Sequence, residues 1–132
     1  MDHLRLMIAY LDSHIVMLLA AGRKNWMSTE ALGLIKRAEL LLSPMAFLEL
    51  EFLFEIKRSK LSARDLFDKV AHETGLRMCD LPFARVAQAA LGEGWTRDPF
   101  DRMIVAQAKA NGFAWLISAD EDFKRHYPRT AW

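Results

Sequence analysis

Short apolar runs alternate with longer segments of helical pattern along most of this 132-residue chain. The clearest runs are residues 6–11, 40–42 and 113–117, which are short and continuous enough for strands buried on both faces. Residues 76–80 and 130–132 are weaker strand candidates, the last at a sheet edge. Strands separated by helices pair in parallel and carry helices on both faces of the sheet. The sequence therefore predicts an α/β fold with a central, mostly parallel sheet.

The helices expected between these strands have recognisable end signals. Ser28 and the Ser43–Pro44 pair are typical helix starts, because a hydroxyl caps the first turn and proline fits its first position. Gly75 and the Asn111–Gly112 pair are typical helix ends. Helices are predicted over residues 13–20, 28–39, 44–58, 63–73, 82–91 and 99–110.

Length and composition limit the functions open to the chain. With 52% hydrophobic and 27% charged residues, it is expected to fold as one globular domain over residues 1–132. A formal net charge of +1 excludes a strongly basic nucleic-acid coat protein. The single cysteine cannot form an internal disulfide, and no apolar run approaches the roughly 18 residues of a membrane span. We therefore expect a cytoplasmic location, no membrane association and no secretion signal.

Acidic residues recur where the predicted strands end. Asp12 directly follows the first strand, and Asp120 comes three residues after the last long strand. Glu49 lies on the helix after the second strand, and Asp98 and Asp101 lie at the start of the helix before the last long strand. In open parallel sheets, ligands bind beyond the carboxyl ends of the strands. These side chains are therefore candidates for one common site.

Each acid also has a purely structural interpretation. Asp12 and Asp98 are good helix caps, the latter just before a proline. Asp101 would favour a first helical turn through its charge alone, and Asp120 and Asp122 fit solvated turns. Taken singly, these residues do not decide between the two interpretations.

Glu49 and Asp101 are harder to explain structurally. At about 100° per residue, Glu49 points about 200° away from Glu51, onto the apolar side of its helix. Asp101 shares a helix face with three apolar residues. A carboxylate on an apolar face is unfavourable unless a cation or hydrogen-bond donors meet it.

A cluster of such carboxylates would need positive charge. Two of them about 4 Å apart repel by roughly 4 kcal/mol at an effective dielectric constant of about 20. A divalent cation is the simplest counterion, and oxygen ligands select Mg²⁺ or Mn²⁺ over zinc. The acids therefore predict a magnesium or manganese site.

Four segments together resemble a PIN-domain protein, and more narrowly the VapC toxins of VapBC toxin–antitoxin pairs. They are LDSH at 11–14, SPMAFLE at 43–49, RDPFDRMIVAQA at 97–108 and LISADEDF at 116–123. The likeness runs from about residue 7 to residue 132, and the RDPFDR block is its most specific part.

The resemblance implies a three-layer α/β/α sandwich and a Mg²⁺- or Mn²⁺-dependent endoribonuclease. Its acidic quartet, both catalytic and metal-binding, maps onto Asp12, Glu49, Asp101 and Asp120. A metal-activated water would attack an RNA phosphate, with no side chain as nucleophile.

Four further residues are secondary site candidates. Ser13 and Ser118 stand where the family often has threonine, and either hydroxyl could hold a metal-bound water. Asp98 is expected mainly to cap its helix, and Asp122 to orient the neighbouring turn.

The resemblance also implies an RNA substrate, a homodimer and inhibition by a VapB-like antitoxin segment. Apolar residues on the early helices exceed what a small sheet covers and could form an interface; they are Leu18, Leu19, Leu32 and Ile35. A basic cluster is expected to be a solvated helix end, with contact to RNA phosphates as the alternative; its members are Lys57, Arg58, Lys60 and Arg64.

Two other functions remain open on such a fold. A receiver-like phosphoacceptor domain would need an adjacent acidic pair after the first strand and a late Lys-Pro, neither of which this sequence has. A non-catalytic interaction module would use the acids only as helix caps.

Overall fold

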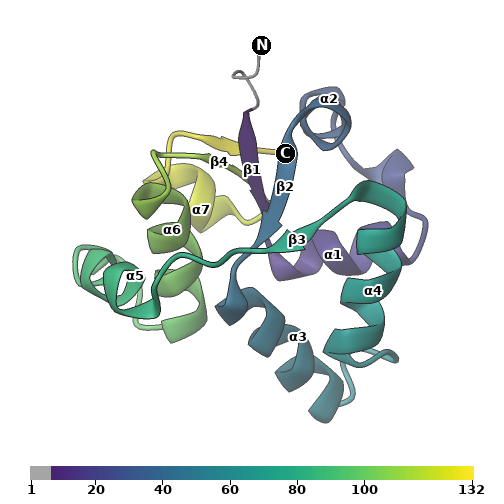
Figure 1. Cartoon of the computed structure of the whole chain (residues 1–132), viewed down its shortest axis with the longest axis horizontal. Coiled ribbons are helices and arrows are strands. Elements are labelled where there is room, and N and C mark those ends of the chain that lie inside the picture. The colour runs from purple at the N-terminus through teal and green to yellow at the C-terminus, as the bar shows by residue number, and fades with distance from the viewer. Residues whose placement is uncertain (1–6) are drawn as a thin grey trace.

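The computed structural model describes residues 7–132 and is built around a sheet of five parallel strands (Figure 1). The strands are β1 (Ile8–Leu11), β2 (Glu39–Leu42), β3 (Arg77–Met78), β4 (Trp115–Ile117) and β5 (Thr130–Ala131). Their order is β3-β2-β1-β4-β5, and every neighbouring pair is parallel. The predicted α/β fold is confirmed, and the last strand lies at a sheet edge as expected.

Helices cover both faces of the sheet and complete a three-layer sandwich. They are α1 (Ser13–Ala20), α2 (Thr29–Arg37), α3 (Pro44–Glu55), α4 (Ala63–Thr74), α5 (Phe83–Ala90), α6 (Pro99–Ala110) and α7 (Glu121–His126), with a short 3₁₀ helix, η2, at Lys24–Trp26. Because parallel crossovers are right-handed, connections that run toward opposite edges of the sheet place their helices on opposite faces. Figure 1 shows α1 and α4 on one side of the strands and α6 and α7 on the other.

The central strands are buried on both faces and end side by side. Leu11, Leu42 and Leu116 are each 0% exposed. Burying a side chain of this size stabilises the fold by about 1.5–3 kcal/mol. Leu11 pairs with Ile117 in the register of β1 and β4, so these two strands end side by side. The residues that follow them are therefore held at one edge of the sheet.

Several elements are shorter than predicted. The helix predicted to 39 ends at Arg37, because Glu39 pairs with Ile8 to begin β2. The helix predicted to 58 ends at Glu55, and Lys57 beyond it has a left-handed φ of 64°. The strand predicted from 113 begins at Trp115, because Phe113 has a φ of 55°.

The remaining differences concern the weakest and the first predicted strands. The strand predicted over 76–80 is reduced to the two residues of β3. Residue 6, in the first predicted strand, lies outside the described residues, as does the start of the predicted domain.

The sequence did not predict α7, the last α-helix of the chain. Residues 121–126 form α7, where the structural interpretation of Asp120 and Asp122 was a solvated turn. That interpretation is wrong, because Asp120 Oδ1 caps α7 by accepting hydrogen bonds from the backbone N–H groups of Asp122 at 2.8 Å and Phe123 at 3.2 Å. Asp122 lies in the first turn and pairs with Arg125 at 2.7 Å.

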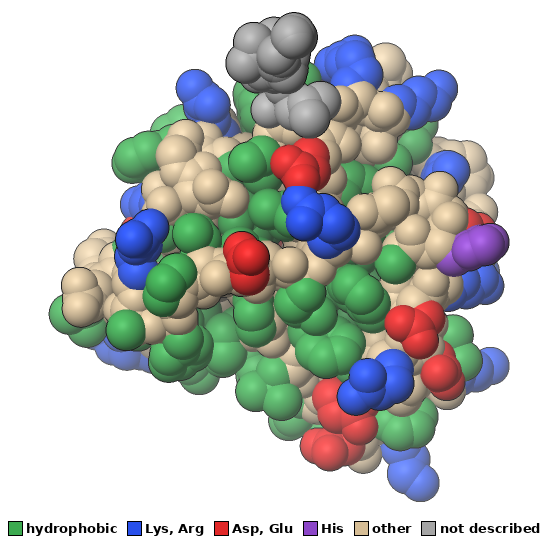
Figure 2. Space-filling view, viewed as in Figure 1, with side chains coloured by type: hydrophobic (Ala, Val, Ile, Leu, Met, Phe, Trp, Pro, Cys, Tyr) green, Lys and Arg blue, Asp and Glu red, His purple; other side chains and the backbone are tan. Residues whose placement is uncertain are grey.

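The exposed apolar surface differs from the one suggested by the sequence. Leu19 is buried, and the other apolar residues singled out on α1 and α2 are partly buried against the core. The most extensive exposure is instead on and near α3 and on α5, at Leu48, Phe52, Phe54, Ile56 and Phe83. Figure 2 shows hydrophobic side chains gathered over α3 and toward α5. No helix within residues 7–132 is long and apolar enough to cross a membrane.

The end of α4 gives a first prediction about stability. Gly75 caps this helix with a φ of 79°, so Gly75→Ala should lower the free energy of unfolding by about 1 kcal/mol through backbone strain alone. In the matched control, Gly33→Ala inside α2, the new Cβ meets only the flexible Arg37 guanidinium at 3.4 Å. That change should raise stability by up to about 1 kcal/mol. Urea unfolding followed by circular dichroism measures both, and shifts of the same sign would contradict this account.

Candidate active site

Asp12 lies at the centre of a polar network at the carboxyl ends of the strands. It follows β1 and is only 6% exposed. Its Oδ1 accepts a hydrogen bond from the Ser13 backbone N–H at 2.7 Å, which caps α1. Its Oδ2 accepts one from the Ser118 hydroxyl at 2.7 Å. Because Ser118 follows β4, this carboxylate ties together the ends of two adjacent strands.

The two serines extend the network to further acids. The Ser13 hydroxyl donates to Glu49 Oε1 at 2.7 Å, which joins α3 to the start of α1. The Ser118 hydroxyl accepts a hydrogen bond from the Asp120 backbone N–H at 3.0 Å. Glu49 is partly buried, whereas Asp120 is exposed. Three of the four predicted acids are therefore connected through serine.

The fourth acid, Asp101, lies in the first turn of α6. Asp98 caps this helix as expected, because its Oδ1 accepts hydrogen bonds from the backbone N–H groups of Phe100 at 2.8 Å and Asp101 at 3.4 Å. Burial, followed by the negative charges of Asp98, Glu49, Asp12 and Asp120, raises the pKa of Asp101 to about 7. Asp101 is thus within electrostatic range of Asp98 and of the other three acids of the predicted quartet.

Negative charge at this edge is only partly balanced. Burial raises the pKa of Asp12 although the Ser118 hydroxyl and nearby His14 lower it. Burial also raises the pKa of Glu49 against the hydrogen bond from Ser13. Within residues 7–132, no ion pair closer than 4 Å involves the four predicted acids. The site is therefore electrostatically suited to a cation.

The acids lie at one edge of the sheet, but their side chains do not form a complete metal-coordination site. In the described part of the chain, no three His, Cys, Asp or Glu side chains are arranged to hold a metal ion. The donor set is nonetheless made of carboxylate and hydroxyl oxygens, the ligands preferred by Mg²⁺ and Mn²⁺, and hydrogen-bonded carboxylates keep spare lone pairs. The chemistry of the residues fits a hard divalent ion. For several of these acids to bind the same ion, their side chains would have to rotate.

A further buried acid, Glu93, was not identified from the sequence. It is 3% exposed, and its Oε2 forms an ion pair with Lys109 Nζ at 2.6 Å. Its Oε1 accepts a hydrogen bond from Trp95 Nε1 at 2.8 Å, and its carbonyl oxygen accepts one from Arg102 Nε at 3.0 Å. The loop before α6 is therefore fastened to two separate turns of that helix.

Trp95 connects the same loop to α7. Its ring stacks on His126, with centroids 4.7 Å apart, and meets Phe123 edge-on at 5.9 Å. Because α6 carries Asp101 and α7 begins after Asp120, the contacts of Glu93 and Trp95 position two candidate acids relative to each other. No local pattern could have indicated this, since Glu93 and Lys109 are 16 residues apart.

The buried ion pair gives a second prediction. Lys109→Met should lower the free energy of unfolding by about 3 kcal/mol, because it leaves the Glu93 carboxylate buried without its partner. Adding Glu93→Gln should recover part of that loss. The control is Lys124→Met, whose pair with the exposed Glu121 at 3.5 Å should contribute less than about 1 kcal/mol. Urea unfolding measures the stability of each variant. Equal losses of unfolding free energy in Lys109→Met and Lys124→Met would show that the buried pair stabilises the fold no more than the exposed pair.

Charge repulsion around Asp101 gives a third prediction, for protein freed of metal by a chelator. The raised pKa of about 7 means that ionised Asp101 is unfavourable in the fold, so its destabilising effect is absent near pH 4 and grows as the pH rises through 7. Asp101→Asn should therefore raise the melting temperature at pH 8 by a few degrees and change it little at pH 4. Asp122→Asn, at an exposed position paired with Arg125, serves as control and should give no such gain. Thermal unfolding at the two pH values decides, and a gain independent of pH would contradict the explanation.

Comparison with known proteins identifies the family. The model of the PIN domain matches residues 9–127 of the chain. The structure is similar to VapBC2 from Rickettsia felis bound to a DNA fragment from their promoter, with 19% identity, a TM-score of 0.62, and coverage of 95% of this chain and 96% of that chain. It is also similar to a toxin–antitoxin complex from Klebsiella pneumoniae, with 17% identity, a TM-score of 0.64, and coverage of 94% and 96%.

A third similar structure is VapBC-1 from nontypeable Haemophilus influenzae, with 15% identity, a TM-score of 0.54, and coverage of 96% of both chains. At these identities the similarity concerns the fold. No curated protein matches the sequence. The match over residues 9–127, together with the parallel sheet and its acidic edge, shows that the chain belongs to the PIN domain family.

Proposed function

We propose that this PIN-domain protein is a Mg²⁺- or Mn²⁺-dependent endoribonuclease. The observation that carries the proposal is the network in which Ser13 and Ser118 link Asp12 to Glu49 and to the backbone of Asp120. Repulsion from these acids contributes to the raised pKa of Asp101, which supports Asp101 as the fourth acid of the site. Partly buried carboxylates with raised pKa values at a strand-end edge are typical of functional sites.

The acidic quartet of Asp12, Glu49, Asp101 and Asp120 would hold the ion. When bound, a divalent ion supplies activation of a water and stabilisation of charge on a phosphate. The chain's own contribution is to fix the ligands. Ser118 keeps one Asp12 oxygen in place, and Ser13 orients Glu49 by donating its single proton.

We further propose that the protein is the toxin component of a type II toxin–antitoxin pair acting in the cytoplasm, blocked by a VapB-like antitoxin. The support is the similarity of its fold to chains in toxin–antitoxin complexes. A homodimer is supported by exposed apolar side chains near one another on α3, since Leu48 is 54% and Phe52 45% exposed. Phe83 on α5 is 66% exposed as well, and Figure 2 shows hydrophobic side chains gathered over α3 and toward α5.

The fourth prediction tests the nuclease directly. Purified protein, freed of antitoxin, should cleave RNA when Mn²⁺ is present and not when a chelator removes it. Asp12→Asn and Asp101→Asn should each reduce the cleavage rate by about 100-fold or more, since each removes a charge that holds the ion. Asp68→Asn, an exposed acid on α4, is the matched control and should cleave like the wild type.

A separate measurement checks metal binding without activity. Mn²⁺ at about 100 times its dissociation constant should stabilise the wild type by about 2.7 kcal/mol, and this stabilisation should be much smaller in Asp12→Asn. Metal-independent stability together with absence of RNA cleavage would favour a non-catalytic interaction module. Cleavage that persists equally in both acid variants would point to a contaminating ribonuclease and contradict the proposal.

A further inference from the structure

An apolar hollow of about 770 Å³ lies along α1, immediately beside the acidic edge. Met17 contributes to its lining from α1, and two indole rings, those of Trp26 and Trp132, line it as well. Ala119, next in sequence to Asp120, also belongs to the lining. Its volume is in the range of small-ligand sites, and it begins where the candidate acids end. The proposed chemistry of the acids does not use it.

Trp26 is the most exposed tryptophan side chain of this hollow. It lies on η2 and is 57% exposed, with the Arg23 guanidinium 4.7 Å from its ring centroid. This cation–π contact holds the indole while leaving more than half of the residue open to solvent. Exposed aromatic rings beside cations are the stacking platforms of single-stranded nucleic-acid sites, because every base offers a π-face.

Positive charge lies next to this hollow along α1. A second hollow, of about 230 Å³, shares Met17 and Ala21 with the first and includes Arg58 and Lys60 in its lining. From Asp12 to Ala21 the chain advances about 14 Å along the axis of α1. The acids therefore lie at the start of this helix, and the aromatic hollow and the cations lie next to each other farther along it. In a polyanion with one phosphate bound at the acids, the phosphates farther along the strand would lie near these cations.

We propose that these two hollows form a track for a single-stranded segment of the RNA substrate. The base next to the cleaved phosphate stacks on Trp26, and phosphates farther along the strand contact Arg58 and Lys60. This inference rests on the proposed ribonuclease function. The cations favour an unpaired nucleic-acid strand over an apolar peptide, and paired bases of an A-form duplex are not splayed out for stacking.

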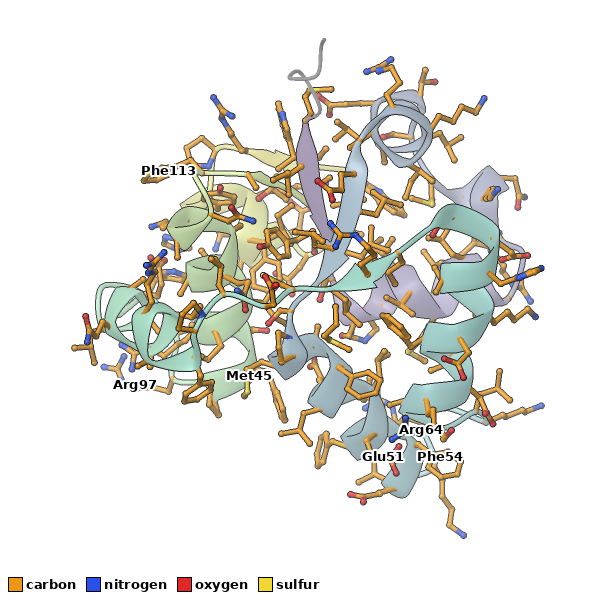
Figure 3. The ribbon with its side chains drawn as sticks, viewed as in Figure 1. Met45, Glu51, Phe54, Arg64, Arg97 and Phe113 are labelled. Atoms are coloured by element: carbon orange, nitrogen blue, oxygen red, sulfur yellow. The ribbon has the colours of Figure 1, made fainter. Side chains whose placement is uncertain are left out.

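The test compares cleavage kinetics of a short single-stranded RNA with Mn²⁺ present. Trp26→Ala should lower kcat/KM by about 5- to 150-fold, the size of one lost stacking contact, through KM rather than kcat, and Trp26→Phe should restore most of it. The matched control is Phe113→Ala, since Phe113 is 58% exposed and lies at the far end of α6 from Arg97 (Figure 3). It should leave both kinetic constants unchanged.

An RNA that lacks the base beside the cleaved phosphate identifies the contact. The wild type should process this abasic RNA as poorly as Trp26→Ala processes intact RNA, and the variant should lose nothing more. Replacing Arg58 and Lys60 by alanine should weaken binding of all sequences and reduce its salt dependence.

Three results would overturn the track. If the wild type cleaves RNA and Trp26→Ala has the same kinetic constants, the track is refuted and the proposed nuclease function still stands. If Trp26→Ala keeps the kinetic constants but binds the antitoxin more weakly, the hollow is a protein-docking surface instead. No RNA cleavage by the wild type would remove the proposed function itself, and the track with it.

Discussion

The functional end of this molecule depends on how one buried carboxylate, Asp12, is held. Burying an ionised carboxylate is unfavourable by several kcal/mol unless donors meet its oxygens. Here the donors are the Ser13 N–H and the Ser118 hydroxyl, supplied by the start of α1 and the end of β4. The same contacts that make the charge tolerable therefore fix the strand ends on which the other acids depend. Because the pKa of Asp12 is still raised, these donors do not compensate fully for burial of the charged carboxylate. A bound cation would stabilise that charge further.

Continuous apolar runs made the fold predictable, whereas segments with few buried residues or left-handed backbone were not predicted. β1, β2 and β4 are buried on both faces, so apart from Glu39 at the start of β2 their sequences are continuously apolar. α7 has only six residues and one buried side chain, Phe123, and its pattern is therefore too short for periodicity to be seen. Its charges did contain information, because acidic residues occupy its first turn and basic residues its last. Left-handed backbone ended α3 early at Lys57 and delayed the start of β4 at Phe113, both residues other than glycine, where sequence seldom indicates this conformation.

The site was predictable to the extent that it follows from strand ends and helix faces. Asp12 could be placed from the end of β1, and Glu49 from the apolar side of α3. The hydrogen bond between Ser13 and Glu49 joins residues 36 positions apart, and it depends on the distance between α1 and α3, which no local pattern contains. The same is true of the pair between Glu93 and Lys109. Asp120 shows a different difficulty, since the sequence offered a solvated turn and a metal site as alternatives, whereas the residue caps α7, a role compatible with a metal site.

Helix α3 relates the active site to the proposed partners. One side of it presents Glu49 to Ser13, while Leu48 and Phe52 on other sides remain exposed. Farther along, Glu51 accepts a hydrogen bond from the Ala63 N–H, which ties α3 to the start of α4, and Figure 3 shows Glu51 near Arg64 there. A second copy covering Leu48 and Phe52 would therefore lie beside Glu49 and border the acidic edge. The track along α1 is lined by other residues, so dimer formation and RNA entry would use different surfaces, and an inhibitor could act on the second without disturbing the first.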